Sequence, residues 1–151
     1  MDKIRKIIQK GGGKVYILLL GAPGSGKGTQ GGMISEKMDI PHLSTGDFFR
    51  NILANPDHEL YKDIQVIKEG KLVSDEIVNS VVREGLREPQ YKNGVIFDGY
   101  PRTVAQAEAL DKMLDAMGEK VDVIIDIQVT REVLLGRLLG RRSCPNCKRI
   151  F

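Results

Sequence analysis

The glycine-rich segment from Gly21 to Thr29 is the part of the sequence best suited to chemistry. Its sequence is GAPGSGKGT, and it follows an apolar run, 15–20, and precedes a stretch of helical character. Glycines let successive backbone N–H groups converge on phosphate oxygens, and the N-terminus of a following helix adds positive potential. Lys27 supplies a positive charge that suits a phosphoryl group in transfer. The segment therefore predicts a phosphate-binding loop.

The loop departs from the common pattern G-x-x-x-x-G-K-[ST] at its last position. Gly28 follows Lys27, and the hydroxyl comes one residue later, at Thr29. An ordinary glycine-rich turn is the alternative, but four glycines, a lysine and the apolar run favour phosphate binding. The candidate phosphate ligands are Gly24, Ser25, Gly26, Lys27, Gly28 and Thr29.

A carboxylate and several arginines elsewhere suit the same chemistry. Asp98 ends a second apolar run, 95–97, and a carboxylate at the carboxyl end of a buried strand can order Mg²⁺ and its waters. A solvated strand-end residue is the commoner case for an isolated Asp. Guanidinium groups fit phosphate oxygens. The candidate arginines are Arg50, Arg102, Arg137 and Arg141.

Arg137 and Arg141 are four residues apart, so one helical face could present both. A solvated basic face is an equally good interpretation of Arg137.

No general base is apparent in the sequence. A phosphate group that acts as the nucleophile needs none, because its second pKa of about 6 leaves it largely ionised at neutral pH.

The elements that must position these residues alternate along the chain. Apolar runs at 15–20 and 95–98 predict buried strands, and the run at 121–129 predicts a third strand. Amphipathic segments between them predict helices, one of them over 59–69. Ser44, Ser74, Thr103 and Thr130 are expected to start helices. The alternation predicts an α/β fold, a three-layer parallel sheet with helices on both faces.

Several ordered motifs resemble the adenylate kinases and their nucleoside monophosphate kinase relatives. They are G-x-P-G-x-G-K-G-T in the loop, L-S-T-G-D at 43–47 with Arg50, G-K-L-V at 70–73, D-G-Y-P-R at 98–102 with Gln106, and G-R-R at 140–142. The resemblance covers about residues 15–151. It implies a P-loop nucleoside-kinase fold with 15–20 in the middle of the sheet, 95–98 on one side and 121–129 on the other.

The resemblance also implies an activity: reversible phosphoryl transfer from MgATP to AMP, giving two ADP. The transfer would involve Lys27, Asp98, Arg102, Arg137 and Arg141, with Arg141 and the loop on ATP. The implied AMP-binding residues are Thr45, Arg50, Lys71, Leu72, Val73, Gly99, Tyr100, Pro101, Arg102 and Gln106. Glu69, Asp75 and Glu76 are interpreted as surface or capping charges.

Two alternatives stay open beside this function. A UMP/CMP kinase is one, although Thr45 favours adenine because the resembling pyrimidine kinases tend to carry alanine there. A non-catalytic nucleotide-binding fragment is the other. The family pattern continues with the rest of a lid, a last strand and a last helix, so the chain is expected to be C-terminally incomplete, with its activity in doubt.

The expected organisation has three parts. Residues 1–14 form an N-terminal extension, 15–142 a kinase core with a monophosphate-binding insertion at about 44–73, and 143–151 the start of the lid.

Cys144 and Cys147 stand in a C-P-N-C pattern that resembles half of the zinc site in the zinc-bearing version of that lid. A redox pair and two ordinary surface thiols are the alternatives.

Composition excludes other classes of function. The net charge of +3 in 151 residues is too small to indicate a nucleic-acid partner, and tryptophan is absent. No apolar run reaches membrane-spanning length. Two cysteines without a disulfide pattern indicate a reducing, cytoplasmic setting. The full-length protein is expected to be a monomer.

Overall fold

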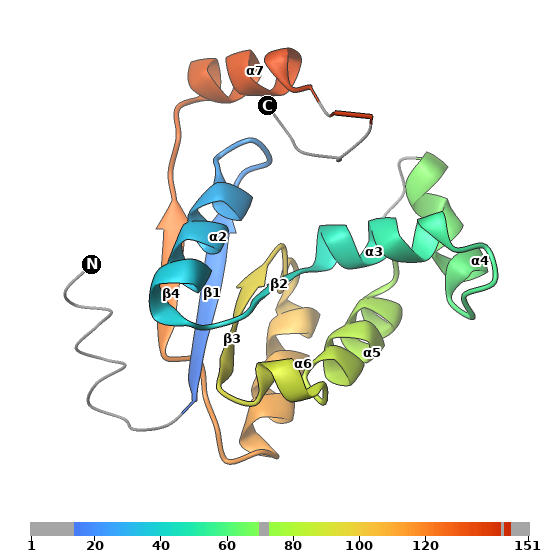
Figure 1. Cartoon of the computed structure of the whole chain (residues 1–151), viewed down its shortest axis with the longest axis vertical. Helices are drawn as coiled ribbons and strands as arrows, with labels where there is room; N and C mark the ends of the chain where they lie inside the picture. The colour runs from blue at the N-terminus through green and yellow to red at the C-terminus, as the bar shows by residue number, and fades with distance from the viewer. Residues whose placement is uncertain (1–13, 70–72, 143, 146–151) are drawn as a thin grey trace.

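The computed structural model describes residues 14–69, 73–142 and 144–145 (Figure 1). Its centre is a four-stranded sheet in which neighbouring strands run parallel. In spatial order the strands are β2 (His42–Ser44), β3 (Gly94–Asp98), β1 (Val15–Gly21) and β4 (Val123–Ile127). The predicted order, with the first apolar run between the other two, is confirmed.

Helices connect the strands and cover both faces of the sheet (Figure 1). They are α2 (Lys27–Met38), α3 (Thr45–Ala54), α4 (Tyr61–Ile64), α5 (Asp75–Gly85), α6 (Val104–Asp115) and α7 (Arg131–Gly140), with the 3-10 segments η1 (Gln65–Glu69) and η2 (Pro89–Tyr91). None of these helices is long and apolar enough to cross a bilayer, and this holds for the described ranges only.

Successive side chains of β1 enter two different cores, because a strand points them to opposite faces. Ile17 and Leu19 pack with Ile34 of α2 on one face. Tyr16 and Leu18 pack on the other face with apolar residues of α3, α5 and α6. Each fully buried aliphatic side chain contributes about 1.5–3 kcal/mol relative to exposure. The expected layers, helix on sheet on helix, are confirmed.

The register of the strands brings their carboxyl ends to one edge. Leu19 pairs with Asp98, and Asp98 pairs with Ser44 on the other side. Gly21, at the end of β1, pairs with Ile127 of β4. The glycine-rich loop, the Asp98 carboxylate and the start of α3 therefore lie at the same edge of the sheet, beyond the carboxyl ends of the strands.

Three of the predicted helix starts carry the expected cap. The side-chain oxygens of Ser44, Ser74 and Thr103 each accept a hydrogen bond from the backbone N–H three residues later. Such a cap satisfies one of the amide groups that a helix start leaves without a partner, and its removal costs about 1 kcal/mol. Thr130 is the N-cap of α7 without a side-chain hydrogen bond.

One expectation for these elements was wrong, and one strand is more exposed than its apolar composition indicates. The single helix over 59–69 is divided into α4 and η1, with Ile64 fully buried at the junction. The run at 121–129 gives a strand of alternating exposure, and Ile124 is 61% exposed. Among the described elements β4 pairs only with β1, so its second edge and outer face lack cover.

Helix α7 lies beyond the carboxyl ends of the strands, above the glycine-rich loop (Figure 1). It buries none of its residues. Its contact with the loop is close, because a Cβ added to Gly24 would lie 3.1 Å from Cγ of Leu138. Large apolar side chains of this helix are exposed, namely Val133, Leu135, Leu138 and Leu139.

Candidate functional site

The glycine-rich loop joins β1 to α2 in a conformation that places glycines in the left-handed region. Gly24 has φ of 82° and Gly26 has φ of 102°. Gly26 is the N-cap of α2 and offers no side-chain acceptor to the first turn. The amide groups that begin α2 are therefore not satisfied by a cap, which is the arrangement that favours an anion at a helix N-terminus.

The Lys27 side chain folds back over this loop. Its Nζ donates to the carbonyl oxygen of Gly21 at 2.8 Å and to that of Ala22 at 3.1 Å. The ammonium group is thereby fixed beside the amide groups of the loop, where phosphate oxygens would be surrounded by backbone donors and one full positive charge.

Of the two arginines around the end of α7, the structure brings only Arg137 to the loop. Its Nη1 donates to the carbonyl oxygen of Ser25 at 3.1 Å, with a longer contact of 3.4 Å to that of Gly24. The expectation that Arg137 and Arg141 share one helical face was wrong. The helix ends at Gly140, and Arg141 is an exposed C-cap in extended conformation.

Asp98 lies at the same edge, next to the first turn of α2. Its side chain is 12% exposed, and its Oδ2 is 3.4 Å from Nε2 of His42. A Cβ added to Gly28 would be 3.6 Å from the same oxygen. The carboxylate thus sits beside the loop, at a position from which it can meet a cation that accompanies phosphate.

A cavity of about 270 Å³ opens beyond the end of β3, between α3, η1, α5 and the start of α6. Apolar side chains form one part of its wall, and polar groups with two arginines form another. It is lined by Thr45, Gly46, Phe49, Arg50, Leu53, Ile67, Val73, Asp75, Val78, Gly99, Arg102, Thr103 and Gln106. A second hollow of about 220 Å³, between the end of α2 and the start of β3, contains none of the predicted residues.

The cavity includes six of the residues implied for an acceptor nucleotide: Thr45, Arg50, Val73, Gly99, Arg102 and Gln106. Tyr100 and Pro101 are not in its lining. Lys71 and Leu72 lie outside the described residues. Thr45 is buried, and its hydroxyl donates to the carbonyl oxygens of Asp98 and Gly99, at 3.3 and 3.1 Å.

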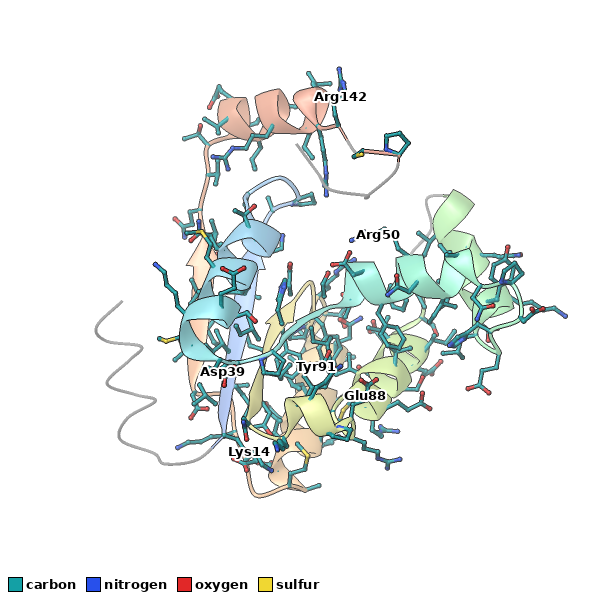
Figure 2. The ribbon with its side chains drawn as sticks, in the orientation of Figure 1. Lys14, Asp39, Arg50, Glu88, Tyr91 and Arg142 are labelled. Atoms are coloured by element: carbon teal, nitrogen blue, oxygen red, sulfur yellow. The ribbon has the colours of Figure 1, made fainter. Side chains whose placement is uncertain are left out.

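The two arginines of the cavity are held differently. Arg50 donates to Asp47 one turn earlier on α3, and both side chains are mostly exposed. Burial alone would raise the pKa of Asp47, but hydrogen bonds from Arg50 and Ser44 outweigh it and lower that pKa. Arg50 extends from α3 toward the side on which α7 lies (Figure 2). Nε of Arg102 donates to the Gly99 carbonyl at 2.7 Å.

Asp75 is an additional member of the site. Its Oδ1 accepts from Nε2 of Gln106 at 2.6 Å, and its Oδ2 accepts from the Thr103 hydroxyl at 2.8 Å. Oε1 of Gln106 accepts from the backbone N–H of Arg102 at 2.7 Å. Asp75 lies in the first turn of α5, as the interpretation as a capping charge required, but that interpretation missed its contacts with α6 and its place in the cavity wall.

Comparison with known proteins agrees with these features. A sequence model described as adenylate kinase matches residues 19–149. The chain belongs to the adenylate kinase family. It is similar to curated adenylate kinases from Caldicellulosiruptor bescii (47% identical over 135 residues), Moorella thermoacetica (50% over 132) and Thermotoga neapolitana (47% over 137). These alignments cover 89%, 87% and 90% of the chain but 63%, 60% and 62% of the relatives.

Metal ligands are few in the part of this adenylate kinase family chain that the structure describes. No group of three or more His, Cys, Asp or Glu side chains there could hold a metal ion. Cys144 is half-buried, and Cys147 lies outside the described residues. The zinc site stays a prediction.

Two residues of the site were missed or misinterpreted in the sequence, for different reasons. Asp75 follows the cap Ser74, so its position matched that of a charge at a helix start. His42 packs on α2, where a Cβ on Gly31 would be only 2.7 Å from its Nε2. The sequence signal for His42 was Gly31. Glycine inside a helix costs about 1 kcal/mol relative to alanine, so its presence there indicates that another group packs closely against the helix.

Tyr100 links stability to pH in this member of the family. It is 1% exposed, and its hydroxyl lies 2.7 Å from Oδ1 of Asn79 and 3.1 Å from the carbonyl oxygen of Gln106. Burial raises its pKa from the usual 10.0 to about 12. The neutral phenol is therefore favoured in the folded state, and this contribution is full below pH 10 and lost as pH rises through about 12.

We expect the free energy of unfolding to fall by about 1–3 kcal/mol between pH 9 and pH 12 on account of Tyr100. Tyr100→Phe should not show this alkaline decrease in the free energy of unfolding. At pH 7 it should be about 1 kcal/mol less stable than the unchanged protein, because Asn79 loses its hydrogen bond. Urea unfolding of both proteins at a series of pH values measures the difference. An equal alkaline loss in both would contradict the assignment to Tyr100.

Proposed function

We propose that the chain acts in reversible phosphoryl transfer from MgATP to AMP, giving two ADP. The observation that carries this proposal is the common edge of β1, β3 and β2. At this edge lie a phosphate-suited loop with Lys27, the Asp98 carboxylate beside that loop, and a cavity with two arginines that begins at the residue after Asp98. A donor and an acceptor nucleotide could therefore meet over the ends of the strands.

In the proposed reaction the loop amides and Lys27 bind the phosphates of ATP. Arg50 and Arg102 hold the phosphate of AMP, one oxygen of which attacks the γ-phosphorus while the bond to the β-phosphate oxygen breaks. No proton has to be removed from the nucleophile, so no general base is required. Catalysis then consists of positioning and of neutralising charge.

Mg²⁺ belongs to this proposal as the partner of ATP. The residues present fit it, because Mg²⁺ is usually held by one or two carboxylates together with substrate phosphates, and Asp98 is a carboxylate beside the loop. Bound there, Mg²⁺ would neutralise negative charge on the phosphate oxygens. Arg137 would exchange its loop carbonyl partners for the phosphates in transfer, and Arg141 would join it after a movement of the segment that follows α7.

The division of the chain is part of the same proposal. Residues 15–142 would be the kinase core, about 44–73 its monophosphate-binding insertion, 143–151 the start of a lid and 1–14 an extension. The position of the cavity beside α3 and η1 supports this assignment of the insertion. A monomeric full-length protein, a cytoplasmic setting and structural zinc at Cys144 and Cys147 also stay predictions.

A coupled assay tests the proposal. The chain is mixed with MgATP and AMP, and ADP formation is followed through pyruvate kinase and lactate dehydrogenase. We expect ADP formation that requires both nucleotides. Binding of ATP without ADP formation would contradict catalysis by the chain and favour a non-catalytic nucleotide-binding protein.

Acceptor preference is a separate prediction: AMP over UMP and CMP. The apolar wall suits the larger ring of a purine, and Gln106 suits adenine over uracil. The Thr45 hydroxyl donates to two backbone carbonyls, so the preference is not assigned to it. The kcat/KM values for the three acceptors at saturating MgATP measure the preference. A higher value for UMP or CMP would contradict it and identify a pyrimidine nucleotide kinase.

A further inference from the structure

We propose that Asp75 is a positioning residue that fixes the direction of the Gln106 carboxamide and thereby selects the base of the acceptor. The selected base would carry an amino group beside a ring nitrogen that accepts a hydrogen bond, as adenine does. Bases that carry a carbonyl oxygen beside a ring N–H would be rejected. This inference rests on the proposed function, because it concerns the acceptor cavity.

The direction of the carboxamide follows from its two partners. Gln106 is 4% exposed; its Oε1 accepts from the backbone N–H of Arg102, and its Nε2 donates to Asp75. An ionised carboxylate can only accept, and a backbone N–H can only donate. A reversed amide would set oxygen against carboxylate and NH₂ against N–H. The pair therefore permits one direction only.

Asp75 is itself held by the start of α6. The hydroxyl oxygen of Thr103 accepts the capping hydrogen bond from the backbone N–H of Gln106, at 3.1 Å. The hydroxyl hydrogen is then available to the second oxygen of Asp75, at 2.8 Å. Asp75 is also the first residue of α5, where the positive end of the helix favours a carboxylate. Two helix starts thus meet at this side chain.

The fixed carboxamide has one acceptor and one donor position left. A glutamine side chain has two lone pairs on oxygen and two hydrogens on nitrogen, and the network uses one of each. Gln106, Asp75 and Arg102 all line the cavity. An acceptor beside a donor complements the amino group and ring nitrogen of adenine, which amide side chains bind in bidentate fashion.

The 6-oxopurine of IMP has the reverse pattern at the same edge. Its O6 accepts and its N1–H donates, so the fixed carboxamide would meet it acceptor to acceptor and donor to donor. A good bidentate pair discriminates by about 1–3 kcal/mol, which corresponds to about 5- to 150-fold in binding. AMP and IMP differ little elsewhere, so the ratio of their dissociation constants reports the direction of Gln106.

The test is calorimetric titration of the chain with AMP and with IMP. In the unchanged protein we expect AMP to bind about 5- to 150-fold more tightly than IMP. In Asp75→Ala this ratio should fall by about fivefold or more, because one hydrogen bond that fixes the carboxamide is lost. Asp75→Ser should behave alike, since its shorter side chain does not reach Nε2, and it serves if the alanine variant does not fold.

Two matched variants separate positioning from charge. Glu76→Ala removes the neighbouring, exposed carboxylate from the same turn of α5 and should leave the ratio unchanged. Asp75→Asn keeps an oxygen that can accept from Gln106 and should largely keep the ratio. An equal loss of selectivity in Asp75→Asn and Asp75→Ala would mean that charge sets the ratio, and it would overturn the proposal.

The variant Gln106→Ala completes a double-mutant cycle. If Asp75 acts through Gln106, adding Asp75→Ala to Gln106→Ala should not change the ratio of AMP to IMP binding. A further change of the same size as in the unchanged background would overturn the proposal. Failure of the protein to bind either nucleotide would refute the proposed function itself. Preference for AMP that survives in Asp75→Ala would refute only the role of Asp75.

Discussion

Replacement of Lys27 by methionine is expected to lower the rate of ADP formation from MgATP and AMP by about 100-fold or more, with the fold intact. Methionine has a similar length but carries no charge, so the loop would lose its one ammonium group beside the helix start. Loss of a single group that stabilises charge in a transition state typically costs about 10²–10³ in rate. The hydrogen bonds to Gly21 and Ala22 that Lys27 makes are partly exposed, and their loss should have little effect on stability.

The coupled assay measures the rate, and far-UV circular dichroism with urea unfolding checks the fold. Lys37→Met is the matched control, because Lys37 is an exposed lysine near the other end of the same helix. It should retain the rate of the unchanged protein. Unreduced ADP formation in Lys27→Met would show that the phosphates do not bind in this loop.

Gly94→Ala is expected to destabilise the fold by about 3 kcal/mol or more. Gly94 begins β3 with φ of +114°, and a Cβ there would lie 2.1 Å from the carbonyl oxygen and 2.4 Å from the nitrogen of Val15. Those atoms belong to the central strand, whose backbone is paired on both sides and cannot move aside. Strained backbone of this kind costs about 1–3 kcal/mol before the clash is added. A total stability of about 5–15 kcal/mol makes the loss severe.

Gly32→Ala provides the matched control, since it is the same substitution inside α2 with nothing within 4 Å of the new methyl group. It should stabilise the protein by about 0.5–1 kcal/mol, because alanine favours a helix over glycine. Urea unfolding of the three proteins gives the free energies. Equal stability of Gly94→Ala and the unchanged protein would contradict the close approach of β3 to β1.

Features that depend on short stretches of chain could be predicted from the sequence. The glycine-rich loop lies between a continuous apolar run and a helix, and each part has a local physical cause. The caps at Ser44, Ser74 and Thr103 follow from a hydroxyl that reaches the N–H three residues later. The position of Asp98 at the edge of the sheet follows from its place at the end of an apolar run.

Features that depend on contacts between distant segments could not be predicted. Asp75 and Gln106 are 31 residues apart, and only the packing of α5 against α6 joins them. The exposure of Ile124 depends on what pairs with β4, which the composition of the strand does not indicate. Arg141 has helical spacing from Arg137, but the helix ends between them at Gly140. Periodicity marks an amphipathic segment without fixing where it ends.

The most direct test of the proposed function starts from the product side, with the chain and MgADP alone. Nucleotides are separated by chromatography at intervals, and inorganic phosphate is assayed in parallel. Reversible transfer between two nucleotides predicts that ATP and AMP appear in equal amounts as ADP disappears, without release of phosphate, and that Lys27→Met abolishes this change. Unchanged ADP, or its loss as AMP and inorganic phosphate without ATP, would contradict phosphoryl transfer between nucleotides by this chain.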